Sequence, residues 1–238
     1  MNIIHRKVRV VAAPVFVGTR VSILVTEDSP VWGFKTANIA TGSARVLVDW
    51  GDGSVDAFTE NVRDVTHAYA VPGRYEVCFS DDLASFALSA KSGVHMRTYG
   101  PMIAGVWSNA RKLDALLSYA FGSCANLTEI DFKETRIRAI PEYCFFHCAS
   151  LVNLDNLPVG LVEICKRGFC NCEQIEVARF PNVVSVGGTG SLLAFSGCTA
   201  LREIHFAEAN KEALLASEAF QDDPEHLGAP NATVMFDL

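Results

Sequence analysis

The sequence predicts a mainly β protein, in which a β-sandwich is followed by a solenoid of short strands joined by small helical turns. Two observations support this prediction. Residues 1–94 contain alternating apolar and polar stretches separated by turn residues, which is the pattern of half-buried strands. Residues 120–206 repeat one short phrase four times, and a repeat period in this range is typical of solenoid proteins.

The repeated phrase is an aromatic residue, two others, a cysteine, two others, and a leucine or isoleucine. Its phenylalanines recur after 24, 24 and 26 residues, as Phe121, Phe145, Phe169 and Phe195. Its cysteines keep the same steps, as Cys124, Cys148, Cys172 and Cys198. A thiol at a stacked repeat position packs like a small hydrophobic residue. We therefore expect these four cysteines to be buried and reduced rather than paired in disulfides.

Composition narrows the function classes. The chain has 238 residues, of which half are hydrophobic and a fifth are charged, so it can form two modest globular domains. A formal net charge of −7 argues against nucleic-acid binding, which needs clustered Lys and Arg. The longest uncharged run, residues 180–201, contains four glycines and a proline, so we expect no membrane insertion.

The basic start at residues 5–9, followed by apolar residues 10–19, resembles a signal peptide only superficially. Pro14 and Gly18 break the apolar run and no convincing cleavage site follows. We expect a β-strand here instead, which leaves the localisation open.

In the first domain we expect strands at residues 8–11, 21–25, 44–50, 65–69, 75–79 and 85–88. Asp52-Gly53 between two of them predicts a hairpin with a type I′ turn, which needs positive φ at both central residues. Pro72-Gly73 suits the centre of a type II turn.

Three phrases in this part carry a family resemblance. They are Trp50-Gly-Asp-Gly53, His67-Ala-Tyr69 and Pro72-Gly-Arg-Tyr75-Glu-Val77. Together they resemble a PKD (polycystic kidney disease-type) immunoglobulin-like domain. The resemblance implies an Ig-like β-sandwich that acts as a spacer or interaction module, usually on secreted or surface proteins.

The repeated phrase carries a second resemblance. Ala-Phe-x-x-Cys-x-x-Leu is the hallmark of leucine-rich repeats of the BspA type, which the chain resembles over about residues 105–220. The resemblance implies one short strand after each cysteine, an irregular return and a small helical turn. Residues 107–116 read as a shortened first coil, Phe220 starts a degenerate fifth copy, and residues 232–236 form a closing strand. The predicted domains are therefore a PKD-like β-sandwich, 1–94, and a leucine-rich-repeat domain, 95–238.

The polar residues between the apolar strand positions are the candidate binding residues. In such repeats the apolar positions point inward and the intervening positions face out. The outward positions also include Lys133 and Val177, and the candidate binding residues among them are Glu129, Asp131, Asn153, Asp155, Arg179, Glu203 and His205. This mostly acidic stripe is either a solvated face or a surface that binds a partner.

Other chemistries are less well supported. Asp49, Asp52 and Asp56 could offer oxygen ligands to calcium, but turns also collect aspartate for backbone reasons. Cysteines 165, 170 and 172, with His147 and Cys148, could suggest zinc, but Cys170-x-Cys172 is too tightly spaced. The glycine-rich segment 187–191 lacks the lysine of a phosphate-binding loop.

We find no catalytic constellation, and therefore expect no enzyme activity, no cofactor and no bound metal. The sequence favours a binding or adhesion protein that recognises a protein or glycan partner through its repeat surface. The resemblances point to a bacterium or one of its mobile elements, and to surface display. The alternative is a structural component of a larger assembly, such as a phage or surface appendage, with no independent ligand.

Overall fold

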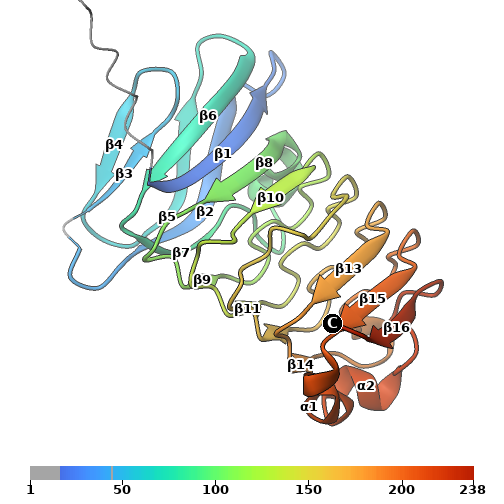
Figure 1. Cartoon of the computed structure of the whole chain (residues 1–238). Helices are drawn as coiled ribbons and strands as arrows, with labels where there is room; N and C mark the ends of the chain where they lie inside the picture. The colour runs from blue at the N-terminus through green and yellow to red at the C-terminus, as the bar shows by residue number, and fades with distance from the viewer. Residues whose placement is uncertain (1–16, 44) are drawn as a thin grey trace, which may run out of the picture.

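A computed structural model describes residues 17–43 and 45–238, and it is mainly β, with short strands and few helices. The chain runs from antiparallel strands near its start to rows of short parallel strands near its end (Figure 1). The strand expected at residues 8–11 lies outside the described residues.

The first part contains seven strands in two antiparallel sheets. They are β1 Gly18–Val25, β2 Val31–Ile39, β3 Val46–Asp49, β4 Val55–Phe58, β5 Val62–Ala68, β6 Gly73–Ser80 and β7 Leu83–Ala87. One sheet has the order β4-β3-β6-β1 and the other β5-β2-β7. Their inner faces meet through aromatic side chains, because Phe34 on β2 lies 5.1 Å from Phe79 on β6, between ring centroids. Strands β2 and β4 were not expected from the sequence.

The turn predictions had different outcomes. The hairpin at residue 52 is confirmed, since β3 and β4 pair antiparallel. Its loop has positive φ at Gly51 and Gly53 but not at Asp52, so the type I′ prediction is wrong. The type II prediction is also wrong, because Gly73 lacks positive φ and begins β6 opposite Val25.

Both sheets continue beyond residue 94. After two short helical segments, η1 His95–Tyr99 and η2 Gly100–Met102, the chain forms β8 Ile103–Ser108. Strand β8 pairs antiparallel with β1 and parallel with β10, Glu129–Asp131. Strand β9, Ala115–Leu116, extends the other sheet by pairing with β7. The division into domains at residue 94 stays a prediction. Both hydrogen-bonded sheets contain strands from before and after this residue.

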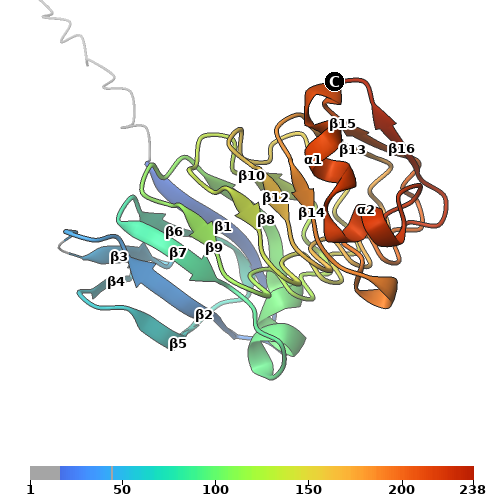
Figure 2. The same cartoon turned by 90° about the horizontal axis from the view of Figure 1, so that it is seen from below.

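The repeats form two rows of short parallel strands. The first strand row is β8, β10, β13 Val177–Phe180, β15 Glu203–Phe206 and β16 Thr233–Phe236. The second strand row is β9, β11 Ala139–Ile140, β12 Glu163–Ile164 and β14 Ser185–Val186. Figure 2 shows β9, β12 and β14 following one another along the molecule. The sequence predicted only the first row and an irregular return in place of the second.

The remaining elements are single turns. They are η3 Gly190–Leu192, η4 Glu208–Asn210, α1 Lys211–Leu215 and α2 Glu218–Asp222. Helix α2 carries Phe220, the aromatic residue that starts the degenerate fifth copy.

The repeated phenylalanines form a stack through the core. Phe121 lies 5.0 Å from Phe145, Phe145 lies 5.3 Å from Phe169, and Phe169 lies 5.5 Å from Phe195, each between ring centroids. The rings in each pair are within 11° of parallel. The stack begins against the first part of the chain, since Phe86 on β7 meets Phe121 edge to face at 5.8 Å.

The repeated cysteines are fully buried, and three of them donate hydrogen bonds. The Sγ atoms of Cys148, Cys172 and Cys198 lie 2.9–3.1 Å from the carbonyl oxygens of Phe121, Phe145 and Phe169. A thiol at this position therefore fills space like a small apolar group and gives a second donor to a carbonyl oxygen that already accepts a backbone N–H.

Thiol counting tests this arrangement. All eight cysteines are free, and only Cys78 and Cys165 are half-buried rather than buried. Burial raises the pKa of Cys165 to about 11 and also raises the pKa of Cys78, so even these two react slowly. We expect Ellman's reagent to titrate eight thiols in denatured protein without reductant, and at most two in native protein. A denatured count of four or fewer would contradict the arrangement.

Candidate functional site

The first strand row is interrupted between β10 and β13. Residues 152–155 occupy the intervening position but form no strand. Asn153, Asp155 and Asn156 all have low β propensity, and Pro158 follows, which cannot donate a ladder hydrogen bond. A cavity of about 290 Å³ lies at this interruption, where the first row turns toward the second.

The cavity has an apolar floor. Its innermost residues are all at most 8% exposed, and they are Leu154, Leu157, Leu161, Phe180 and Val183. Pro158, Val159 and Pro181 line the sides. The amide of Asn182 donates to the carbonyl oxygen of Val159 at 2.9 Å and joins the two loops that form the opening.

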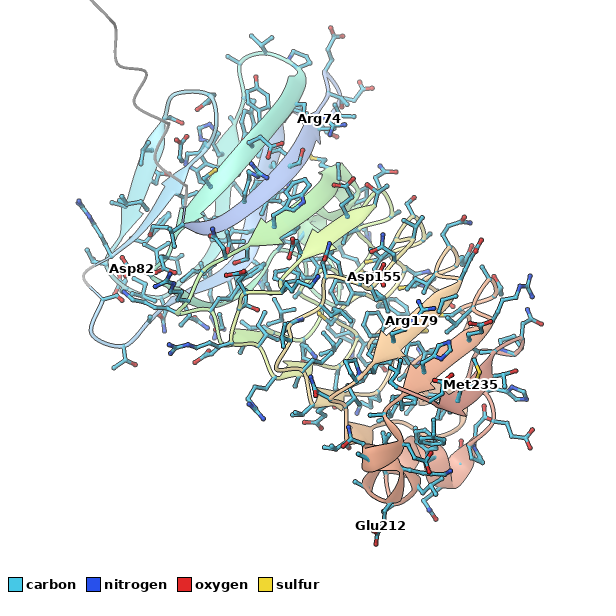
Figure 3. The ribbon with its side chains drawn as sticks, viewed as in Figure 1. Arg74, Asp82, Asp155, Arg179, Glu212 and Met235 are labelled. Atoms are coloured by element: carbon cyan, nitrogen blue, oxygen red, sulfur yellow. The ribbon has the colours of Figure 1, made fainter. Side chains whose placement is uncertain are left out.

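Three charged residues surround the opening. They are Lys133, Asp155 and Arg179, one from each of three successive coils, and all are exposed. Lys133 Nζ lies 3.3 Å from Asn156 Oδ1. Within residues 17–43 and 45–238, the side chains of Asp155 and Arg179 make no hydrogen bond or ion pair. Figure 3 shows these two residues on the same side of the molecule. Their charges are therefore available to a ligand.

The other predicted residues of the stripe lie away from this opening. Glu129 and Asp131 are on β10, opposite Gly105 and Trp107 of β8. Trp107, which the sequence placed at the start of the first coil, instead lies half-buried on β8 beneath the guanidinium of Arg20, 4.8 Å from the ring centroid. Asn153 is exposed in the segment that forms no strand.

Glu203 and His205 contact each other, and His205 also contacts a more distant part of the chain. His205 is only 8% exposed, and its Nδ1 lies 2.8 Å from Asp237 Oδ1 while its Nε2 lies 3.0 Å from Glu203 Oε2. Burial alone would lower the pKa of His205, but the hydrogen bonds to Asp237 and Glu203 outweigh it and raise the pKa above the ordinary value. This histidine joins β15 to the residue that follows β16.

The raised pKa of His205 predicts a pH dependence of stability. A group whose pKa is higher in the folded chain stabilises the fold below its unfolded pKa of about 6.5, and this contribution disappears as the pH rises through the folded value. We expect the melting temperature of the wild type to exceed that of His205→Gln by more at pH 5.5 than at pH 8.5. A difference that does not change between these pH values would contradict the interaction.

The three aspartates considered for calcium are held by the hairpin itself. Asp49 accepts from the backbone of Gly51 at 2.9 Å, and Asp56 accepts from the indole of Trp50 at 2.9 Å. Hydrogen bonds from Ser54 and His67 lower the pKa of Asp52 to about 2. Each carboxylate therefore has a structural partner.

Neither the clustered cysteines nor the glycine-rich segment 187–191 has the geometry of a ligand site. In the described part of the chain, no group of three or more His, Cys, Asp or Glu side chains could hold a metal ion. The amides of Gly188 and Gly190 donate to the carboxylates of Glu218 and Asp222, which would repel a phosphate group.

The helices described outside residues 1–16 and 44 have five residues or fewer, and none could cross a bilayer.

Comparison with known proteins identifies the repeats. Residues 112–224 match the family described as BspA type leucine rich repeat region, in six copies. The chain therefore contains a leucine-rich-repeat region of the BspA type, as the sequence predicted. No curated protein matches the chain.

Two solved structures resemble the chain. The leucine rich repeat protein of T. pallidum (TpLRR) is 16% identical, with 66% of this chain and 73% of that chain covered and a TM-score of 0.41. A leucine-rich repeat protein from Bacteroides ovatus ATCC 8483 is 17% identical, with 68% of this chain and 45% of that chain covered and a TM-score of 0.40.

Proposed function

We propose that this protein is a non-enzymatic binding module that recognises a protein partner through the first strand row, centred on the cavity beside Arg179. Leucine-rich-repeat proteins commonly bind other proteins or mediate adhesion. In this chain the repeat region presents charged and polar side chains on a series of parallel strands, while the stacked phenylalanines keep the strands in place.

One observation carries the proposal. The opening brings together an apolar floor and two charged side chains, Asp155 and Arg179, that have no partner within the described residues. Solubility alone explains exposed charged side chains, but it does not explain an apolar cavity between them. A concave apolar site with a few polar groups around it is the usual form of a binding site.

We further propose that two structural units hold the site in place. The repeats form a solenoid, and the first part of the chain is a PKD-like, Ig-type sandwich that supports the solenoid at one end. In support, the loop Trp50–Ser54 is fixed by the hydroxyl of Tyr69, which donates to the carbonyl oxygen of Trp50 at 3.1 Å. This contact links two of the phrases on which the PKD resemblance depends.

A binding screen tests the proposed function. The full chain is passed over an array of extracellular and bacterial surface proteins and over a glycan array, beside Arg179→Glu and the control Arg138→Glu. Arg138 is exposed next to β11 of the second strand row, so the control makes the same charge change elsewhere. We expect a protein ligand whose binding is lost in Arg179→Glu and kept in Arg138→Glu.

Other outcomes would contradict the proposal. A glycan ligand that depends on Arg179 would show that the site is real and the partner class wrong. Absence of any ligand, together with self-association at constant stoichiometry by light scattering, would favour a structural component of a larger assembly.

A further inference from the structure

We infer that the cavity beside Arg179 accepts one apolar side chain of an extended peptide segment that carries a carboxylate next to that side chain. The inference rests on the proposed function and specifies its ligand.

The size of the cavity favours a single side chain. Its volume of about 290 Å³ lies at the lower limit of the roughly 300–1,000 Å³ found for pockets that enclose whole small ligands. The lining consists mainly of leucine, valine, proline and phenylalanine carbons. A leucine, methionine or phenylalanine side chain fits within this space and would remove part of the lining from water.

The polar groups inside the cavity are too few for a sugar. One N–H of the Asn182 amide donates to the carbonyl oxygen of Val159, which leaves its second N–H and its Oδ1 beside floor residues that offer no side-chain donor or acceptor. A buried sugar would leave several hydroxyl groups without partners, and each unpaired buried group opposes binding. A protein side chain has no such groups to satisfy.

The charges at the opening indicate what lies next to that side chain. Lys133 and Arg179 supply two positive charges and Asp155 one negative charge, so the opening is locally positive on a chain with a net charge of −7. The guanidinium of Arg179 is unpaired within the described residues and can bind a carboxylate through two parallel hydrogen bonds. An aspartate or glutamate of the partner, adjacent to its apolar side chain, meets this requirement.

The geometry also indicates an extended ligand. The three charged residues come from three successive coils, so they are spread across the direction of the strands. A ligand that fills the cavity and reaches Arg179 must therefore lie across neighbouring coils. An extended segment does this with side chains on alternate faces.

The test uses a displayed library of random linear 12-residue peptides, selected on the immobilised full chain. We expect enrichment of peptides in which a large apolar residue neighbours an aspartate or glutamate. The dissociation constants of the enriched peptides are then measured for two variants and for a matched control of each variant. Val159→Trp places a large ring at the opening, where Val159 is 63% exposed, and its control is Val184→Trp, at 38% exposure beside β14. Lys133→Glu/Arg179→Glu reverses the charge, and its control is Arg136→Glu/Arg138→Glu.

We expect Val159→Trp to weaken binding at least tenfold and Val184→Trp to leave it unchanged. Selection on the charge-reversed double variant should return peptides with lysine or arginine in place of the acidic residue. Enrichment of no peptide, or of peptides that bind both variants as well as the wild type, would overturn the inference. The proposed function fails by a separate result, namely that the protein array yields no ligand sensitive to Arg179→Glu.

Discussion

Replacing Phe145 with alanine is expected to lower the free energy of unfolding by about 3–5 kcal/mol. The ring is completely buried and lies between Phe121 and Phe169, at 5.0 and 5.3 Å between centroids. Its removal leaves a cavity in the middle of the stack, with rigid neighbours on both sides that cannot close it. The lost burial and the cavity both contribute to the cost.

Urea denaturation of Phe145→Ala beside Val152→Ala measures this effect. Val152 is 49% exposed in the same coil, so its replacement should change the unfolding free energy by no more than about 0.5 kcal/mol. A loss below 1 kcal/mol for Phe145→Ala would mean that the phenylalanine stack is not part of the core.

The second large effect is expected at Gly188, where replacement with alanine should cost about 2–6 kcal/mol. Gly188 has a φ of +103°, and an added Cβ would lie 2.1 Å from the carbonyl oxygen of Leu192. Backbone strain contributes about 1–3 kcal/mol, and the steric clash a further 1–3 kcal/mol or so. The neighbouring oxygen belongs to the backbone and cannot rotate away.

Gly190→Ala is the matched control two residues along the same loop. Gly190 also has positive φ, at +52°, but nothing lies within 4 Å of an added Cβ, so the cost should be only about 1–2 kcal/mol. Thermal unfolding of both variants separates the clash from the strain. Equal losses in melting temperature would show that Gly188 is not confined as described.

The repeats could be predicted from the sequence because one phrase determines their inward side chains. Phe121, Phe145, Phe169 and Phe195 are all fully buried, as are the cysteines three positions later. Each phrase specifies its own apolar positions, so no knowledge of distant contacts is needed. The family match likewise finds repeats here, in six copies over residues 112–224.

The second strand row was missed because its strands have little local signal. Strands β11, β12 and β14 have two residues each, and their regularity comes from hydrogen bonds between coils. Strand β2 was missed for a different reason. Gly33 interrupts its apolar pattern, although the missing side chain is what allows the backbone of Val65 to approach, since an added Cβ would lie 2.2 Å from Val65 O.

The candidate site was only partly visible in the sequence. Outward alternation identified Asp155 and Arg179 as surface residues, but not the cavity between them. The cavity depends on the failure of residues 152–155 to pair with their neighbours, for which Asn153 and Pro158 were the available signals. The engagement of His205 was hidden because its partner Asp237 lies 32 residues away, beyond the next strand of the same row.

The continuity of both sheets across residue 94 has a consequence for any attempt to divide this protein. Strand β8 covers the free side of β1, and β9 covers the free side of β7. A fragment ending near residue 94 would expose both of these strand edges, and a fragment starting there would expose β8, β9 and the ring of Phe121. Unpaired edges recruit other chains and promote aggregation. Each part of the chain thus covers strand edges of the other. We expect either fragment to aggregate when it is expressed alone, and the two parts to stay soluble when they are expressed as one chain.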